Sequence, residues 1–383
     1  MYKHKQPVRI LHVLHSMDRG GAEAMIMNLF RNIDRTKVIF DFLLSEDKEG
    51  SMEAEIRALG GRIYKVPLMT MTNPFPYLKG LNTFFKNHHT EYRIVHSHTS
   101  SKSTFPLYYA KKYGIPVRIA HSHNNRSLMN IDGFVRNILK YPLKKVANRY
   151  FACAKVPAEW LYGKSFCKHH DVKVIYNAID TSQFRYDDSI RNNLRTVLGL
   201  SPDELVVGNV GRIAPQKNHD FILKVFVELL KSRQDKPTKL LLIGDGPLKA
   251  DIERKIRDYN IEDNVILTGN VNNVHEYLQA LDVLLFPSLF EGLPVVVVEA
   301  QCAGLLCVVS KYAITDEVGL TDLVHYVSLD DSPAIWSNKI LENIPYDRRD
   351  TVEDIQRGGY DIVESAKNMT EFYVNEYINS ESK

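Results

Sequence analysis

The sequence is poor in cysteine and has no long apolar run. Its four cysteines occur among 383 residues without any C-x-x-C spacing, so neither a disulfide framework nor a thiolate metal site is expected. The first apolar stretch, Ile10–Leu14, is interrupted by His12 and is far too short for a signal peptide. No stretch approaches the roughly 18 apolar residues that span a membrane. We expect a protein of a reducing compartment, cytoplasmic or attached at most to a membrane surface.

A complete dinucleotide-binding fingerprint is also missing. The segment His15–Glu23 follows the first apolar run and contains no G-x-G-x-x-G, and Gly244-Asp-Gly246 lacks the third glycine. An isolated G-x-G is a weak signal for a nicotinamide cofactor. Dehydrogenase chemistry is therefore disfavoured.

The net charge of +3 conceals an uneven distribution. Residues 1–182 contain 28 Lys and Arg against 14 Asp and Glu, whereas the remaining residues contain 21 against 32. Cations mix with aromatic and aliphatic residues in Tyr77–Lys86 and in Phe134–Arg149, which Pro142 is expected to break. Two interpretations of these segments stay open. They form either the solvent-exposed faces of amphipathic helices or a peripheral contact with an anionic membrane. Nucleic acid is not expected as a partner, because no nucleic-acid-binding motif accompanies the charge.

Strand and helix patterns alternate along the chain, which is typical of an α/β protein with parallel sheets. The length predicts two domains of about 150–200 residues, joined near the polar stretch Ile179–Ser189. Apolar runs predict strands at Val8–Leu14, Ile39–Leu44, Arg62–Val66, Ile94–Ser97, Val117–His121, Tyr150–Ala152, Val172–Ile175, Val206–Val210, Lys239–Gly244, Val265–Thr268, Val283–Phe286 and Leu306–Ser310. Amphipathic patterns predict helices at Ala22–Arg31, Glu53–Leu59, Tyr77–Lys86, Ser103–Tyr113, Asp220–Ser232, Pro247–Tyr259, Val274–Leu281, Val295–Cys302 and about Ala366–Asn379.

The most informative motif follows the predicted strand Val283–Phe286. It reads Ser288-Leu-Phe-Glu-Gly-Leu-Pro, continues to Glu299 and ends in Ala-Gln-Cys-Ala-Gly304. Glu291 lies in a loop at a strand's carboxyl end, and Glu299 lies eight positions later, inside the next helix. In an open α/β sheet ligands bind at this edge, and the helix N-terminus offers unpaired N–H groups to an anion. One ligand can therefore be held at two points.

This segment resembles the donor-sugar motif of retaining glycosyltransferases with the GT-B fold, in particular family four. Members of this family have two Rossmann-like domains that face one another across an interdomain cleft. The resemblance implies an acceptor domain at residues 1–182 and a nucleotide-sugar domain at 183–365. It also implies that a C-terminal helix, about 366–383, packs back on the first domain. The resemblance is weaker near Glu317, where Lys311–Thr315 replaces the usual paired glycines.

The resemblance also assigns roles to residues of the second domain. Glu299 would accept hydrogen bonds from the ribose hydroxyls, Glu291 would lie beside the sugar ring, and the backbone amides at Gly292 and Leu293 would face the diphosphate or the sugar.

An earlier element, Gly211-Arg212-Ile-Ala-Pro-Gln-Lys217-Asn218, is similar to the family's Gly-Arg…Lys-Asn sequence. Arg212 offers a planar fork of donors and Lys217 a compact charge, and both suit phosphate oxygens.

In the first domain, Gly20-Gly21 opens a helix and lets backbone approach a ligand closely. The family places this loop over the donor phosphates and the acceptor. It often has a histidine near the transferred sugar, here His121, with His123 as an alternative, and His96 and His98 end the neighbouring strand. Clustered histidines also suggest a metal. No Glu or Cys accompanies them at ligand spacing, so we interpret them as substrate-facing and expect no metal site.

The predicted activity is a retaining, metal-independent transfer of a hexose from a nucleotide diphosphate sugar. The acceptor would be a glycan or a polyprenyl-linked oligosaccharide, as in exopolysaccharide or capsule biosynthesis. No Asp-x-Asp occurs, which is the signature of metal-dependent enzymes of the other major glycosyltransferase fold, and no cofactor is implied. Two alternatives remain: a non-catalytic nucleotide-sugar-binding scaffold, and a GT-B sugar epimerase.

Overall fold

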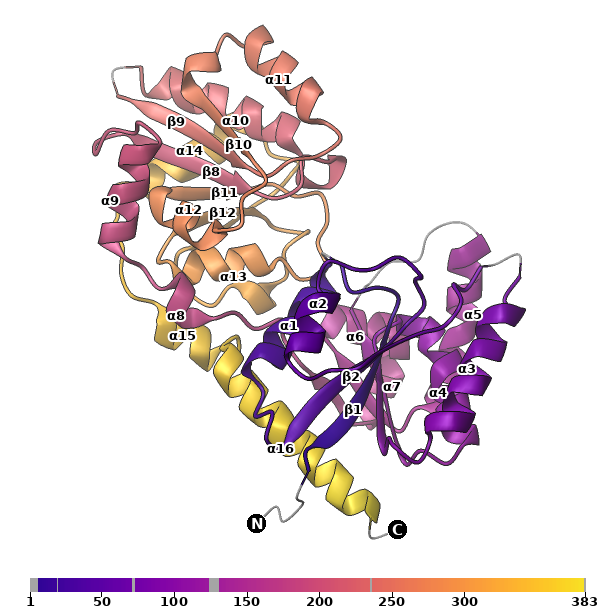
Figure 1. Cartoon of the computed structure of the whole chain (residues 1–383). Coiled ribbons are helices and arrows are strands. Elements are labelled where there is room, and N and C mark those ends of the chain that lie inside the picture. Colours follow the sequence, from indigo (N-terminus) through magenta and orange to yellow (C-terminus); the bar gives the residue numbers. More distant parts are fainter. Residues whose placement is uncertain (1–5, 19, 71–72, 124–130, 235, 382–383) are drawn as a thin grey trace. The chain divides into compact units, whose positions relative to one another are not determined.

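The chain folds into two compact units, each built on one parallel sheet (Figure 1). The computed structural model describes residues 6–18, 20–70, 73–123, 131–234 and 236–381. The first unit consists of Met1–Ala178 with Ile362–Lys383, and the second of Ile179–Asp361. Within the described residues the first sheet has seven strands and the second has six. The α/β fold predicted from the alternation of strands and helices is confirmed.

The first sheet has the strand order β3-β2-β1-β4-β5-β6-β7. Its strands are β1 (Val8–Leu14), β2 (Val38–Leu44), β3 (Ile63–Lys65), β4 (Ile94–Ser97), β5 (Val117–Ser122), β6 (Arg149–Ala152) and β7 (Val172–Val174). The helices of this unit are α1 (Gly21–Asn32), α2 (Glu53–Ala58), α3 (Phe75–His88), the 3-10 helix η1 (Ser100–Ser103), α4 (Thr104–Lys112), α5 (Ile131–Val146), α6 (Lys155–Tyr162), α7 (Lys164–His169) and α16 (Ile362–Glu381).

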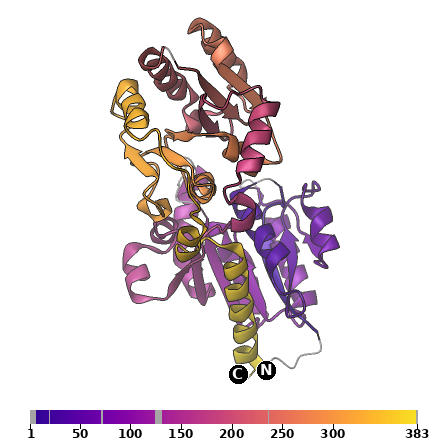
Figure 2. The same ribbon diagram turned by 90° about the vertical axis from the view of Figure 1, so that its left-hand side faces the viewer.

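Helix α16 lies across one face of the first sheet (Figures 1 and 2). It contacts α1 and the strands β1, β2, β4 and β5. Alternate residues of a strand point to the same face, and Ile10 and Leu14 of β1 share a buried cluster with Ala366, Met369 and Tyr373 of α16. The last helix of the chain therefore completes the core of the first unit.

The second sheet has the order β10-β9-β8-β11-β12-β13. Its strands are β8 (Leu205–Val210), β9 (Thr238–Ile243), β10 (Val265–Gly269), β11 (Val283–Phe286), β12 (Leu306–Ser310) and β13 (Val324–Val327). Its helices are α8 (Thr181–Phe184), α9 (Asp188–Val197), η2 (Pro215–Lys217), α10 (His219–Ser232), α11 (Lys249–Asp258), η3 (Glu262–Asn264), α12 (Val274–Ala280), α13 (Val295–Cys302), η4 (Asp316–Val318), α14 (Pro333–Glu342) and α15 (Val352–Arg357).

Two segments contain helix that was not expected from the sequence. The polar stretch predicted as a join contains α8 and the start of α9, whose first turns are capped by the carboxylates of Asp180 and Asp187. Asp is a favoured N-cap residue. The two aspartates therefore mark the starts of helices, which were missed because the whole stretch is polar. Pro142 lies inside α5 and does not break it. The proline removes a hydrogen bond to the carbonyl of Ile138, a residue that is 52% exposed, so water can replace the lost partner.

None of the helices formed by the described residues is both long enough and apolar enough to cross a bilayer.

Candidate active site

Backbone hydrogen bonds join the loops at the carboxyl edge of the second sheet. The loop after β8 docks on the loop after β9, because Ile213 N donates to Asp245 O at 2.9 Å and Leu248 N donates to Ile213 O at 3.1 Å. A Cβ atom on Gly246 would overlap the backbone of Ile213, and Gly244 has a φ of +137°. The G-x-G sequence therefore serves close packing of two loops.

The loop after β11 is tied to the same edge. Leu289 N donates to Gln216 O at 2.8 Å, and the Asn218 amide donates to Pro287 O at 3.3 Å. Asn218 has a left-handed backbone, with φ of 57°, a conformation that asparagine tolerates better than most residues. These bonds bring the Arg212–Asn218 element beside the Ser288–Glu299 motif, although the two segments are far apart in the sequence.

An ion pair links the two motifs. Lys217 Nζ lies 2.8 Å from Glu291 Oε1, and their side chains are only 15% and 8% exposed. The Gln216 amide donates to Glu291 Oε2 at 3.1 Å, and Lys217 Nζ lies 4.3 Å from the centre of the Phe286 ring. The carboxylate and the ammonium are thus held in place and largely withdrawn from water. Gln216 was not anticipated from the sequence, although it directly precedes Lys217.

Arg212 is an unpaired cation at this edge. Its side chain is exposed, and it makes no hydrogen bond or ion pair within the described part of the chain. The nearby His219 adds no positive charge at neutral pH, because burial, and then the charge of Lys217, lower its pKa to about 4. Arg212 therefore contributes a free positive charge at this edge.

Glu299 lies in α13, whose N-terminus follows Pro294 and has no side-chain cap. The residue is half-buried, and burial raises its pKa to about 7. Its carboxyl group has no hydrogen-bond partner among the residues that the structure describes. At neutral pH the group is divided between its acid and its carboxylate, so it can both donate to and accept from a hydroxyl. Gly292 and Leu293 lie half-buried in the loop before α13.

In the first unit, α1 begins at Gly21 and Gly20 is its N-cap residue. The carboxyl group of Glu23 lies against Gly20, and burial raises the pKa of that carboxyl. A Cβ on Gly21 would meet no atom within 4 Å, and the residue is exposed. Internal packing therefore does not account for the second glycine of the pair.

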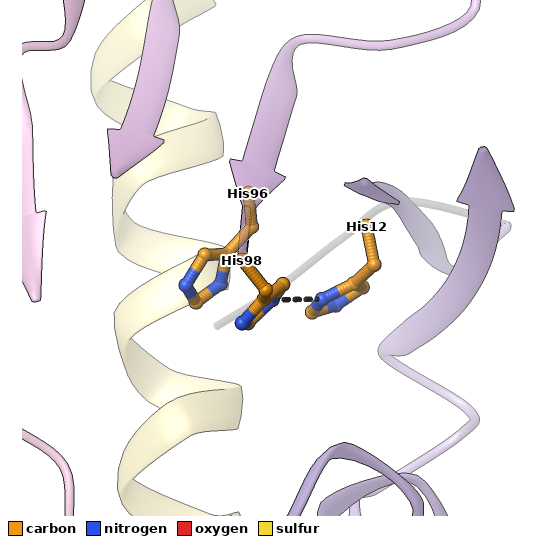
Figure 3. Close-up of side chains that lie close together, drawn as sticks. All are labelled: His12, His96 and His98. Atoms are coloured by element: carbon orange, nitrogen blue, oxygen red, sulfur yellow. Dashed lines mark hydrogen bonds between the residues drawn. The ribbon is translucent and has the colours of Figure 1, made fainter. Parts of the chain in front are cut away.

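The predicted residue His121 belongs to a buried cluster of histidines. The cluster also contains His12, His96, His98 and His123, carried by β1, β4, β5 and the residues just after β4 and β5. Figure 3 shows the ring of His98 between those of His96 and His12. His12 was not predicted as a site residue from the sequence, although alternation in the strand places it on the same face as Ile10 and Leu14.

Two hydrogen-bonded chains connect these rings. In the first, His98 Nε2 lies 3.0 Å from His12 Nδ1, and His98 Nδ1 lies 2.8 Å from His123 Nε2. In the second, the Tyr373 hydroxyl lies 2.7 Å from His96 Nδ1, and His96 Nε2 lies 3.1 Å from His121 Nδ1.

All five imidazoles are neutral at physiological pH. Burial lowers the pKa of His12 and of His123 to about 3. Burial, with added repulsion from neighbouring imidazoles, lowers the pKa of His96, His98 and His121 well below the ordinary value.

Comparison with known proteins identifies the family. The family model described as "Glycosyl transferases group 1" matches residues 190–322, and the one described as "Glycosyltransferase Family 4" matches residues 19–183. The Bacillus subtilis protein named putative glycosyltransferase EpsF is 36% identical over 87% of this chain and 86% of its own length. This chain belongs to the family 4 glycosyltransferases.

Other relatives cover nearly the whole of this glycosyltransferase. A capsular polysaccharide biosynthesis glycosyltransferase of Staphylococcus aureus, CapH, is 24% identical over 97% of this chain and 100% of its own length. The crystal structure of Anabaena Alr3699/HepE in complex with UDP aligns with a TM-score of 0.76 and 17% identity, covering 96% and 100% of the two chains. The GT-B fold that the motif implied is thereby confirmed.

The Lys217–Glu291 pair leads to a prediction about stability. Lys217→Met leaves a nearly buried carboxylate without its cation, and Glu291→Gln leaves the ammonium alone. The double substitution removes both charges. We expect the free energy of unfolding, measured by urea denaturation, to show a coupling of about 1–3 kcal/mol between the two sites.

The exposed pair Lys231–Glu228, with side chains 63% and 35% exposed, is the matched control and should show a coupling below about 0.5 kcal/mol. If the two single substitutions change the free energy of unfolding by amounts that simply add up in the double variant, the ion pair contributes no interaction energy.

A second prediction concerns Glu299 and pH. Its ordinary pKa of 4.5 is raised to about 7 in the folded protein. The folded state therefore binds the proton more tightly, and this stabilisation is complete below pH 4.5 and is lost as the pH rises through about 7. Glu299→Gln removes this dependence. Relative to wild type, the variant should gain about 1–3 kcal/mol in the free energy of unfolding between roughly pH 5 and pH 8.

Urea denaturation at several pH values measures this difference. A stability difference that does not change with pH would mean that the carboxyl group titrates at its ordinary pKa.

Proposed function

We propose that this glycosyltransferase transfers a hexose, with retention of configuration, from a nucleotide diphosphate sugar to a glycan or polyprenyl-linked acceptor in exopolysaccharide or capsule biosynthesis. The observation that carries the proposal is the Lys217–Glu291 ion pair beside the unpaired Arg212 at the carboxyl edge of the second sheet. Such an edge is where open α/β sheets bind ligands. The name of CapH supports the pathway, and the UDP in the HepE crystal structure supports a nucleotide donor.

In this proposal the donor diphosphate displaces Glu291 from Lys217. Phosphate oxygens are better partners for the ammonium, because they carry more charge than one carboxylate and also reach the fork of Arg212. Glu291 is then free to accept hydrogen bonds from the hydroxyls of the hexose. The amides of Gly292 and Leu293 and the N-terminus of α13 add donors for the anion.

Glu299 binds the ribose of the donor in this proposal. Its half-buried carboxyl has no protein partner among the described residues, so ribose hydroxyls can satisfy it. Gly20 and Gly21 let backbone approach the phosphates, as the family resemblance implies. The resemblance also implies that His121 contacts the transferred sugar, and because its side chain is fully buried, this contact requires the histidine cluster to open.

The proposed mechanism is a front-face substitution. The leaving diphosphate accepts the proton of the acceptor hydroxyl, so no protein nucleophile is needed. Arg212 and Lys217 stabilise the charge that develops on the diphosphate, which is a task that a divalent metal performs in other enzymes. We therefore propose a metal-independent transfer.

A thermal-shift screen with UDP-, GDP- and ADP-sugars, without added metal, tests donor binding. A ligand that binds the folded state raises the melting temperature by mass action. We expect one nucleotide class to raise it for wild type and for Glu262→Ala, a control at an exposed site in η3, but not for Glu299→Ala. Absence of any shift would contradict the proposal.

Turnover of the bound donor separates the alternatives. Sugar transfer to an acceptor supports the transferase. Binding without turnover would favour a non-catalytic scaffold, and interconversion of the nucleotide sugar without an acceptor would favour an epimerase.

The first unit carries a surface that suits a lipid-linked acceptor. Helices α3 and α5 both contact α4. They expose aromatic side chains, with Phe75 at 77%, Phe134 at 68% and Tyr141 at 76%. Lys79 and Lys145 are exposed on the same helices. Exposed aromatic residues interspersed with cations are typical of proteins that lie on anionic membranes. We propose that this surface contacts the cytoplasmic leaflet.

Co-sedimentation with lipid vesicles tests this contact. Each cation near an anionic leaflet is worth about 1 kcal/mol. Removal of two by Lys79→Ala with Lys145→Ala should therefore weaken binding to vesicles rich in phosphatidylserine about 30-fold. Replacement of Lys224 and Lys231 by Ala in the second unit is the matched control and should leave binding unchanged. Equal binding to purely zwitterionic vesicles would contradict an electrostatic contact.

A further inference from the structure

The five clustered histidines lie on, or directly after, three neighbouring strands. In the parallel register, His12 of β1 is paired with His96 of β4. His96 is in turn paired with Ile119 of β5, two positions before His121. Since alternate residues of a strand share a face, His98 and His123 continue the same column toward the carboxyl edge. Neutral imidazoles from separate strands thus meet in one place.

Two subsets of this cluster have the spacing of a metal site. One ring nitrogen from each of His12, His96 and His98 lies within 4.8 Å of the others, and the same is true of His98, His121 and His123. Nitrogens on a tetrahedral ion at about 2.0–2.1 Å are about 3.4 Å apart. The second subset therefore needs the rings to close by at most about 1.4 Å, which rotation about the broad χ2 torsion of histidine can supply.

The hydrogen bonds favour the subset that contains His98, His121 and His123. His98 Nε2 is paired with His12 Nδ1, and His121 Nδ1 is paired with His96 Nε2. When those two inner nitrogens carry the protons, the lone pair of His121 Nε2 is available. The lone pair of His98 Nδ1 faces His123 Nε2 at 2.8 Å, so an ion bound there replaces a hydrogen bond within the subset. Histidine ligands commonly have their other nitrogen fixed in this way. In the other subset both nitrogens of His96 are hydrogen-bonded to groups outside it, Tyr373 and His121. One of the two bonds of His98, by contrast, is to His123 of its own subset.

An unsatisfied buried atom points to the same place. Within the described residues three ring nitrogens of the cluster are buried without a hydrogen-bond partner, and two of them, His121 Nε2 and His123 Nδ1, belong to this subset. The third is His12 Nε2. The side chain of His121 is fully buried, and leaving such a polar atom without a partner costs about 1–3 kcal/mol. A ligand that binds this nitrogen removes that cost. His123 is partly exposed, so the subset reaches solvent at this residue.

We propose that His98, His121 and His123 bind one divalent first-row transition-metal ion, with His12 and His96 fixing the orientation of the ligands from behind. Three imidazoles and no carboxylate select ions such as Zn²⁺, Co²⁺, Ni²⁺ or Cu²⁺ over Mg²⁺ and Ca²⁺. The fourth position is left for water. The proposal does not depend on the proposed transfer, which needs no metal. An ion on His121 occupies the nitrogen that the transfer offers to the sugar, so Zn²⁺ should inhibit the enzyme.

Titration of metal-stripped full-length protein with Zn²⁺ alone, followed by calorimetry, tests the site without donor or acceptor. We expect one equivalent to bind to wild type. His123→Gln should lose this binding, because it removes a ligand whose ring is partly exposed while keeping a polar side chain. His12→Gln, which removes only the residue behind His98, should weaken binding about 10–100-fold. Co²⁺ in place of Zn²⁺ should give the intense visible absorption of a tetrahedral site.

His169→Gln is the matched control, because His169 is an exposed histidine of α7 in the same unit. It should bind Zn²⁺ as wild type does. Circular dichroism and the melting temperature of each variant establish that it is folded. The proposal is overturned if folded His123→Gln binds Zn²⁺ with the same stoichiometry and affinity as wild type, or if wild type binds none.

Discussion

Parallel strand pairing is the constraint on which the arrangement of both units depends. Parallel strands place all their carboxyl ends at one edge of the sheet, so loops that are distant in sequence are neighbours there. In the second unit this brings the loop after β8 against the loop after β11, and with it Lys217 against Glu291. In the first unit the same rule gathers histidines from β1, β4 and β5. If the strands alternated in direction, the loops after β8 and β11 would lie at opposite edges of the sheet.

The Lys217–Glu291 pair and the histidine cluster compensate for the burial of their polar atoms in different ways. Lys217 and Glu291 form an ion pair in which each charge has the other as its partner. The histidines have no counter-ion among the described residues, and burial keeps them uncharged, with hydrogen bonds as their compensation. Glu299 is an intermediate case: it is half-buried and unpaired, and its pKa rises to about 7. A charged group in an ion pair can exchange its partner for a charged ligand. A neutral imidazole can instead offer its lone pair to a metal ion.

Local patterns in the sequence predicted much of this structure. The apolar run Val283–Phe286 and the helix Val295–Cys302 have the predicted bounds, because buried parallel strands and apolar helices give strong continuous signals. The edge strand β13 was not predicted, since it is only half-buried and contains His325 and Tyr326. For the candidate site, the motifs indicated Lys217, Glu291 and Glu299.

The pairing of these residues could not be predicted from the motifs. The bond between Gln216 and Glu291, and the place of His12 beside His98, depend on strand register and loop contacts. No local pattern encodes these contacts.

The final helix shows how far such long-range dependence extends. The chain leaves the first unit at Ala178 and returns at Ile362, so the second unit is an insertion in the first. During synthesis on a ribosome, the first sheet therefore emerges well before Tyr373, and part of one face stays uncovered until the segment that contains Tyr373 has been translated.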